Sequence, residues 1–180
     1  MDLRIPLVGL SPRCPAQVRH GLDALRLDEQ LPQPVECILW NLPFVADVGR
    51  GESVNAEPNG RLMRGFFAAA VRAAGLWQQA DPSAPPPTIA VSLGIDQFAD
   101  WGLLAVARDC FLHLKDVHLF EPSQHGAYAA RRNKRDDIFD IGEMRTYCFS
   151  IDLCRLEAAV HMVDVQVRMP PLQNYNTAVQ

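Results

Sequence analysis

Two carboxylates, Asp96 and Glu121, are the residues of this sequence best placed for acid–base chemistry. Each follows a short apolar run of the kind that forms a buried strand. Two neighbouring carboxylates can bind a divalent cation such as Mg²⁺ or share general acid and base roles. His125 follows Glu121 closely and is a third candidate catalytic residue. A simpler interpretation stays open, in which Asp96 caps a helix and Glu121 is a solvated turn residue before Pro122.

Five further residues are candidate ligand-binding residues, most of them because they follow predicted strands. In open α/β sheets, ligands bind beyond the carboxyl ends of parallel strands, beside helix N-termini with unpaired N–H groups. These candidates are Ser11, Arg13, Asn41, Asp47 and Arg61. Arg61 instead shares one face of a predicted helix with Arg64 and Arg72, where arginines either meet an anion or form the solvated face.

Short apolar runs bounded by proline, glycine or polar residues predict the strands that must position these groups. The first four are apolar runs rather than alternating ones, whereas the last two alternate as half-buried strands do. They span Leu3–Leu10, Val35–Leu42, Thr88–Ile95, Val117–Phe120, Arg145–Ile151 and Val163–Val167. Apolar residues at helical spacing predict three helices, at 15–27, 61–77 and 97–114.

The order of these elements predicts an α/β fold. Strands separated by helix-length segments need crossover connections, which favour parallel pairing. We expect a single domain over residues 1–172, with a mixed, mostly parallel sheet of five or six strands, three main helices and an antiparallel C-terminal edge. A frayed tail is expected at 173–180. The alternative is an α+β domain whose helices cover one face only.

Composition excludes several classes of protein. The chain has 180 residues, of which 48% are hydrophobic, and this fits one folded domain better than a disordered chain. The net charge of -4 does not support nucleic-acid binding, although the basic stretch 131–135 does not exclude it. Five cysteines, an odd number, and no apolar run of membrane length predict a soluble cytoplasmic protein with reduced thiols and no membrane partner.

Specific catalytic motifs are missing from the sequence. No segment matches G-x-G-x-x-G, the P-loop or the serine nucleophile elbow. Four residues hint at a metal site through their proximity in the chain: Cys110, His113, His118 and His125. Because they fall on a predicted buried helix, a strand and a loop, we predict ordinary side chains and no metal site, and leave open whether they approach one another.

Two functions remain, and whether the chain is an enzyme stays open. The first is a non-catalytic binding or assembly protein, a subunit that contacts a protein partner or a second copy through long loops at 43–60 and 122–144. The second is a small α/β enzyme acting on a nucleotide or other phosphorylated metabolite, with Mg²⁺ as its cofactor and Arg13 or Arg61 holding the anion. The missing catalytic motifs favour the first.

Overall fold

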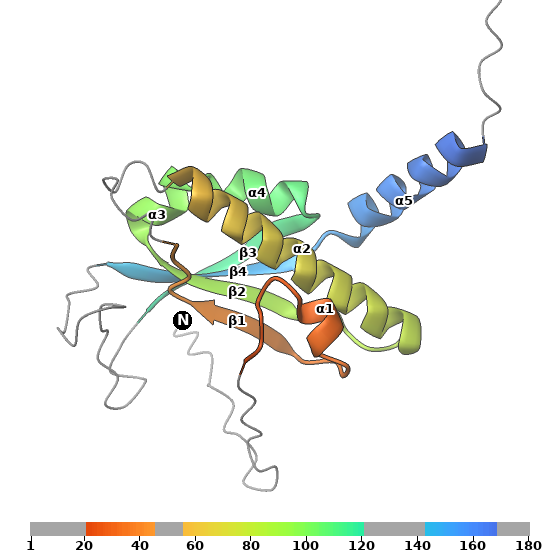
Figure 1. The fold of residues 1–180 in the computed structure, drawn as a ribbon, viewed down its shortest axis with the longest axis horizontal. Helices are drawn as coiled ribbons and strands as arrows, with labels where there is room; N and C mark the ends of the chain where they lie inside the picture. The colour runs from red at the N-terminus through yellow and green to blue at the C-terminus, as the bar shows by residue number, and fades with distance from the viewer. Residues whose placement is uncertain (1–20, 46–55, 121–142, 169–180) are drawn as a thin grey trace, which may run out of the picture.

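The described part of the chain comprises residues 21–45, 56–120 and 143–168 of a computed structural model. One sheet is formed by β1 (Cys37–Asn41), β2 (Thr88–Gly94), β3 (Leu112–Leu119) and β4 (Met144–Ile151). The helices in these ranges are α1 (Leu27–Gln30), α2 (Ala56–Ala80), α3 (Ile95–Asp100), α4 (Leu103–Asp109) and α5 (Leu153–Arg168). Figure 1 shows α1 to α4 on one side of the sheet and α5 leading away from it.

The strands lie in the spatial order β1-β2-β4-β3. β1 pairs parallel with β2, and β4 pairs antiparallel with both β2 and β3. β1, β2 and β3 therefore run in the same direction, although β3 touches neither of the other two. Their carboxyl ends meet at one edge of the sheet, beside the start of β4. We call this the carboxyl edge; it is marked by Asn41, Gly94, Leu119 and Met144.

A mixed sheet in a single α/β domain is confirmed, but the expected sheet of five or six mostly parallel strands is wrong. The described sheet has four strands, and most of its pairings are antiparallel. The reason is that β4 enters between β2 and β3 and pairs with both. The antiparallel strand is therefore central rather than at the C-terminal edge. Helices α1 to α4 lie on one face, which is the arrangement of the α+β alternative (Figure 1).

Three predicted strands are confirmed, because β1, β2 and β4 lie at the apolar runs 35–42, 88–95 and 145–151. The predicted helix at 97–114 is wrong. Gly102 adopts a left-handed φ of 60° that ends one short helix before the next begins. β3 then starts at Leu112, because its apolar residues alternate as in a half-buried strand.

The predicted last strand, Val163–Val167, is also wrong, because these residues belong to α5. Apolar residues at 153, 156, 160, 163 and 167 also follow helical spacing, and no proline or glycine interrupts the run. The predicted strand at 3–10, most of the predicted helix at 15–27 and the tail at 173–180 lie outside the described residues.

Helix α2 forms the centre of the core and extends the predicted helix at both ends. Phe66 and Phe67 are at most 1% exposed. The Phe67 ring lies 5.1 Å from the Phe149 ring of β4, and the Phe66 ring lies 5.0 Å from that of Trp40 of β1. These centroid distances are typical of favourable aromatic pairs. α2 therefore ties β1 to the centre of the sheet.

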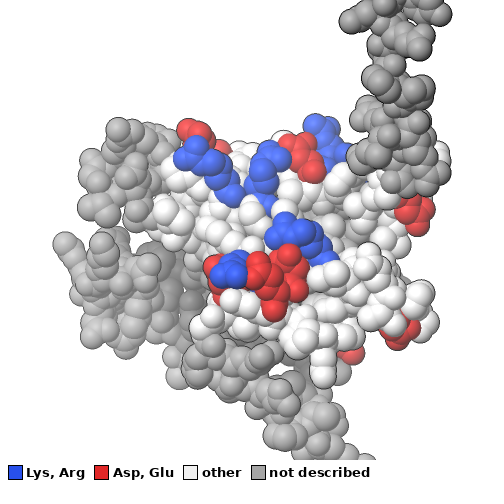
Figure 2. Space-filling model, turned by 45° about the vertical axis from the view of Figure 1, so that its right-hand side comes forward, with Lys and Arg blue, Asp and Glu red and all other residues white. Residues whose placement is uncertain are grey.

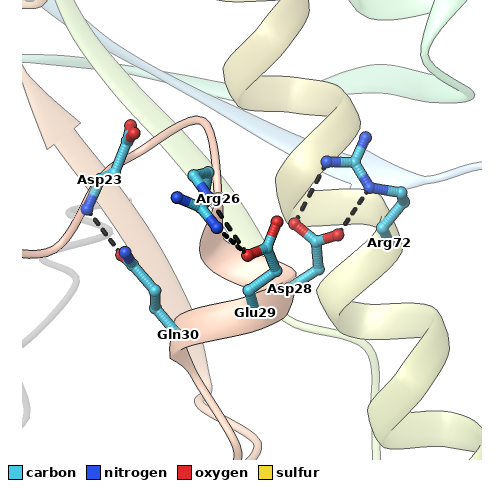
Figure 3. Close-up of polar contacts among 6 residues, drawn as sticks. All are labelled: Asp23, Arg26, Asp28, Glu29, Gln30 and Arg72. Carbon is cyan, nitrogen blue, oxygen red and sulfur yellow. Dashed lines mark hydrogen bonds and ion pairs between the residues drawn. The ribbon is translucent and has the colours of Figure 1, made fainter.

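The exposed side of the helical layer carries alternating charges. Figure 2 shows basic and acidic side chains next to each other over this face. The clearest pair joins α1 to α2, where Arg72 donates two hydrogen bonds to Asp28 at 2.8 and 3.1 Å (Figure 3). Arg26 pairs with Glu29 beside it (Figure 3). The hydrogen bond from Arg72 lowers the pKa of Asp28.

The Asp28–Arg72 pair predicts a small, pH-dependent contribution to stability. A carboxyl whose pKa is lowered by folding stabilises the fold above its unfolded pKa, and this contribution is lost as pH falls. Asp28→Asn should therefore reduce the free energy of unfolding by less than about 1 kcal/mol at neutral pH. Urea unfolding should show the difference shrinking below about pH 4. Asp100→Asn, at an exposed carboxylate without an ion pair among the described residues, is the control; equal effects of both variants would contradict the prediction.

Candidate functional site

A row of four polar side chains crosses the sheet on the face opposite the helices. The strand register places Asn41 beside Ser92, Ser92 beside Thr146, and Thr146 beside His118. Neighbouring residues in register point to the same face of a sheet. Ile38, Val91 and the other core residues of these strands point to the helices instead. We call these four residues the polar row, and Asn41 is its end at the carboxyl edge.

The hydrogen bonds within the polar row all donate in one direction, toward Asn41. The Ser92 hydroxyl donates to Asn41 Oδ1 at 2.8 Å, and a second contact of 2.8 Å joins it to the Thr146 hydroxyl. A serine hydroxyl has one hydrogen to donate. Because that hydrogen goes to Asn41, the Thr146 hydroxyl must donate to Ser92. Ser92 is 1% exposed, so this relay is shielded from water and holds the Asn41 amide in one orientation.

The orientation of Asn41 decides what its side chain offers to a ligand. Its oxygen faces inward and accepts from Ser92, so its Nδ2 amino group faces outward as a donor of two hydrogen bonds. Asn41 is exposed, and no described residue accepts a hydrogen bond from Nδ2. At the other end of the row, His118 Nε2 is buried without a hydrogen-bond partner among the described residues. The exposed end of the row thus presents hydrogen-bond donors.

The turn after β1 is held rigidly by one buried side chain. Asn59, on the first turn of α2, is 0% exposed. Its Oδ1 accepts the Val45 N–H at 2.8 Å, and its Nδ2 donates to the Val45 carbonyl at 3.1 Å. At the other end of the turn, the Leu42 N–H donates to the Ser92 carbonyl. Between these anchors Phe44 is 46% exposed, with its ring 6.5 Å from that of Trp101.

Asp96 lies at the same carboxyl edge, in the first turn of α3. It is exposed and forms no hydrogen bond or ion pair with a described residue. Its expected role as a helix cap is not seen, since Gly94 occupies the cap position and its N–H is bound by Gln97. Phe98 stacks on Tyr147 at 4.0 Å and fixes α3 against the sheet. Burial of that tyrosine raises its pKa.

Arg61 lies away from the polar row, on the solvent side of α2. It pairs with Glu57 at 2.6 Å, and Arg64 on the same helix pairs with Asp109 at 2.9 Å. With Arg72 also paired, the arginine face of α2 is internally neutralised. The other predicted site residues lie outside the described residues, and their placement stays a prediction: Ser11, Arg13, Asp47, Glu121 and His125.

Sequence reasoning missed Ser92, Thr146 and Asn59. A signal for Ser92 was present, because it is the polar residue inside the apolar run of β2, and a buried hydroxyl needs a partner. Thr146 and Asn59 had no comparable signal, because the residue that each of them binds is distant in the sequence. No group of three potential metal ligands gathers within the described ranges, which include Cys110, His113 and His118 but not His125. Burial raises the pKa of the Cys110 thiol.

Comparison with known proteins identifies a family to which this chain belongs. The model of the BMT5-like family, described as rRNA (uridine-N3-)-methyltransferase BTM5-like, matches residues 12–132, more than half of the chain. The chain belongs to the BMT5-like family. No curated protein and no solved structure matches it. The match to the BMT5-like family includes Asn41, Asn59 and Ser92, and ends before β4.

Membership of the BMT5-like family overturns the preferred functional prediction. The family is named for an enzyme activity, so the hypothesis of a non-catalytic binding or assembly subunit is wrong, and no protein–protein role is supported. The alternative of a small α/β enzyme fits better. The family's named substrate is RNA, a partner that the net charge did not favour. No helix in the described ranges is long and apolar enough to cross a membrane.

A methyltransferase of the BMT5-like family needs a methyl donor, and a glycine at the end of a strand is where a bound nucleotide can approach the backbone closely. Gly94 is the glycine that ends β2 at the carboxyl edge. It has an ordinary negative φ, and an added Cβ would meet only the Gln97 side chain at 3.5 Å. An added Cβ at that distance would be in ordinary van der Waals contact, so packing against the protein alone does not require a glycine at this position.

Proposed function

We propose that this chain binds the target uridine of ribosomal RNA at the carboxyl edge, as a uridine-N3 methyltransferase of its family. The observation that carries the proposal is the fixed orientation of Asn41, whose donors face outward. Uracil has carbonyl oxygens on both sides of N3, and both are acceptors. An outward donor at the end of β1 suits such a base, and the family's named substrate supports the same choice.

The contact that distinguishes uracil is the one to O4. Cytosine carries an amino group at the same position, and an amino group cannot accept a hydrogen bond from Nδ2. A donor at O4 also favours the reaction, because removal of the N3 proton spreads negative charge over N3 and O4. A preorganised donor stabilises charge that develops during a reaction. Asn41 would therefore select the base and lower the cost of its deprotonation.

Two other residues at this edge complete the proposed site. The exposed ring of Phe44 offers a surface on which a uracil ring can stack, and such stacking contributes about 1–3 kcal/mol per base. Asp96 is an exposed carboxylate at the same edge without a described partner. We assign to Asp96 the acceptance of the N3 proton, with the electron pair of the broken N–H bond remaining on the ring.

Photochemical crosslinking tests where the base binds. A single-stranded rRNA fragment carrying 5-iodouridine at its uridine position keeps O2, O4 and the N3 proton, and crosslinks to nearby aromatic rings. After irradiation and proteolysis, mass spectrometry should find the RNA adduct on the peptide that contains Phe44. Phe44→Leu should remove that adduct without a large change in melting temperature, because the ring is half-exposed. Adducts confined to peptides that contain neither Phe44 nor Trp101 would contradict the proposed site.

A further inference from the structure

A groove lined by apolar and basic side chains lies at the edge of the sheet opposite the carboxyl edge, where β3 begins and β4 ends. It has a volume of about 490 Å³ and lies between α4, the start of β3 and the start of α5. Its apolar wall includes Leu104, which is 52% exposed, and Leu114. Arg108, His113 and Arg155 also line it. We call it the arginine groove.

The two arginines of this groove differ from the five other arginines whose side chains the structure describes. Five arginines outside the groove each pair with a carboxylate: Arg26, Arg61, Arg64, Arg72 and Arg145. Arg108 and Arg155 have no carboxylate partner among the described side chains. Two guanidinium groups without an ion-pair partner among the described side chains favour a positive potential at this groove, even though the chain as a whole is acidic.

Arg155 is held in place by its surroundings. The Asp152 side chain accepts the backbone N–H of Arg155 at 3.1 Å at the start of α5, and the backbone N–H of Asp152 donates to the Phe111 carbonyl at 2.7 Å. Phe111 itself has a φ of 60°, a conformation that costs energy in a residue with a side chain. The Arg155 guanidinium lies 5.9 Å from the centre of the Phe111 ring. This contact keeps a planar, charged group facing the groove.

We propose that the arginine groove binds the phosphate backbone of the RNA substrate, at a distance from the target uridine. Guanidinium groups recognise phosphate through paired hydrogen bonds, and the exposed Leu104 can pack against a sugar or base between two phosphates. This inference rests on the proposed function. It goes further by assigning a second contact that base recognition does not need. His113 adds a third nitrogen donor at the same wall.

The position of the groove sets the length of RNA that it can reach. It lies at the start of β3, whereas Asn41 lies at the carboxyl edge, where β3 ends. The strand has eight residues, which corresponds to about 25 Å. At about 3.4 Å per nucleotide, the spacing of stacked nucleotides along one strand of duplex DNA, this is about seven stacked nucleotides. The groove should contribute only when the RNA extends that far beyond its target uridine.

Binding to two RNAs of different length tests the groove. The probes are single-stranded RNAs with one uridine, of about 5 and about 20 nucleotides, followed by fluorescence anisotropy at several salt concentrations. Arg108→Gln with Arg155→Gln should weaken binding of the longer RNA about tenfold or more and leave the shorter RNA unchanged. Each lost phosphate contact should also reduce the salt dependence of log K by about 0.7.

A charge-matched control separates a specific contact from net charge. Arg26→Gln with Arg72→Gln removes the same charge from arginines that already pair with carboxylates. This control should leave binding of the longer RNA unchanged. Equal binding of the longer RNA by wild type and the groove variant would overturn the proposal, as would an equal loss on both RNAs. If the wild type binds the longer RNA through the groove but does not prefer uridine, the proposed base site is contradicted and the proposed groove contact is not.

Discussion

Asn59→Asp is expected to lower the free energy of unfolding by about 3–5 kcal/mol at neutral pH, the usual cost of an unpaired buried charge. The substituted carboxylate could still accept the Val45 N–H. Its second oxygen, however, would face the Val45 carbonyl where the amide now donates. Two acceptors would then meet at a site that is 0% exposed. The turn after β1 should therefore detach, and uridine binding should weaken with it.

This effect should diminish in acid, because a protonated carboxyl can donate to the Val45 carbonyl as the amide does. Burial and the facing oxygen raise the pKa of the new carboxyl in the folded state. Folding then favours its protonated form, so the destabilisation grows as pH rises above the unfolded value of about 3.9 and fades below it. Urea unfolding across this range checks the prediction. Asn59→Ala, which removes the two hydrogen bonds to Val45 without adding charge, is the control. A constant difference between the two variants at all pH values would contradict the role given to Asn59.

The positions of the strands could be predicted more readily than their pairing. Apolar runs mark both β1, which lies at an edge of the sheet, and β2, which is buried between two neighbouring strands and therefore needs apolar side chains. Nothing in those runs encodes that β4 enters between β2 and β3. Pairing order depends on contacts between residues that are distant in sequence, such as Tyr147 with Val91. The sequence pattern therefore predicted the fold class but not the direction of most pairings.

Some predicted helix boundaries were wrong because of local features of the sequence. The predicted helix at 97–114 is apolar at 12 of its 18 positions, and such a run fits two short helices and a strand as well as one long helix. Gly102 was the signal of the break, because its left-handed conformation suits glycine. In α5 the spacing of the valines fits both a strand and a helix. The uninterrupted helical spacing of apolar residues from Leu153 onward is what favours the helix.

The candidate site was predicted in part. Asn41 and Asp96 were expected at one edge because they follow β1 and β2, and the parallel pairing of those strands supports that expectation. The chemistry of Asn41 was not predictable, since its orientation depends on Ser92 and Thr146 in two other strands. A single sequence does not reveal which hydroxyl donates to which. The arginine groove was missed for the same reason, because its two arginines lie on separate elements.

Asn41→Asp is expected to reverse the preference of the protein between uridine and cytidine. One carboxylate oxygen would continue to accept from Ser92, while the other would replace the outward amino group. The outward group would then accept rather than donate a hydrogen bond, which repels O4 of uracil and attracts the amino group of cytosine. The added negative charge should weaken binding of both RNAs, so the informative quantity is the ratio of the two dissociation constants.

Gln79→Glu is the matched control for this charge. It makes the same change at an exposed residue near the end of α2, which leads into the start of β2 at the edge opposite Asn41. This variant should weaken the binding of both RNAs slightly and leave the ratio of their dissociation constants unchanged. Ser92→Ala should reduce the ratio toward one without reversing it, because the Asn41 amide would be free to rotate.

The ratio of dissociation constants for two single-stranded RNAs, identical except for one uridine or cytidine, is the most direct test of the central claim. Wild type should bind the uridine RNA about tenfold more tightly, which corresponds to one base-specific contact. Asn41→Asp should bind the cytidine RNA more tightly, with a melting temperature close to that of wild type. Equal binding of both RNAs by wild type, or an unchanged preference in Asn41→Asp, would contradict the assignment of Asn41 as the residue that reads the base.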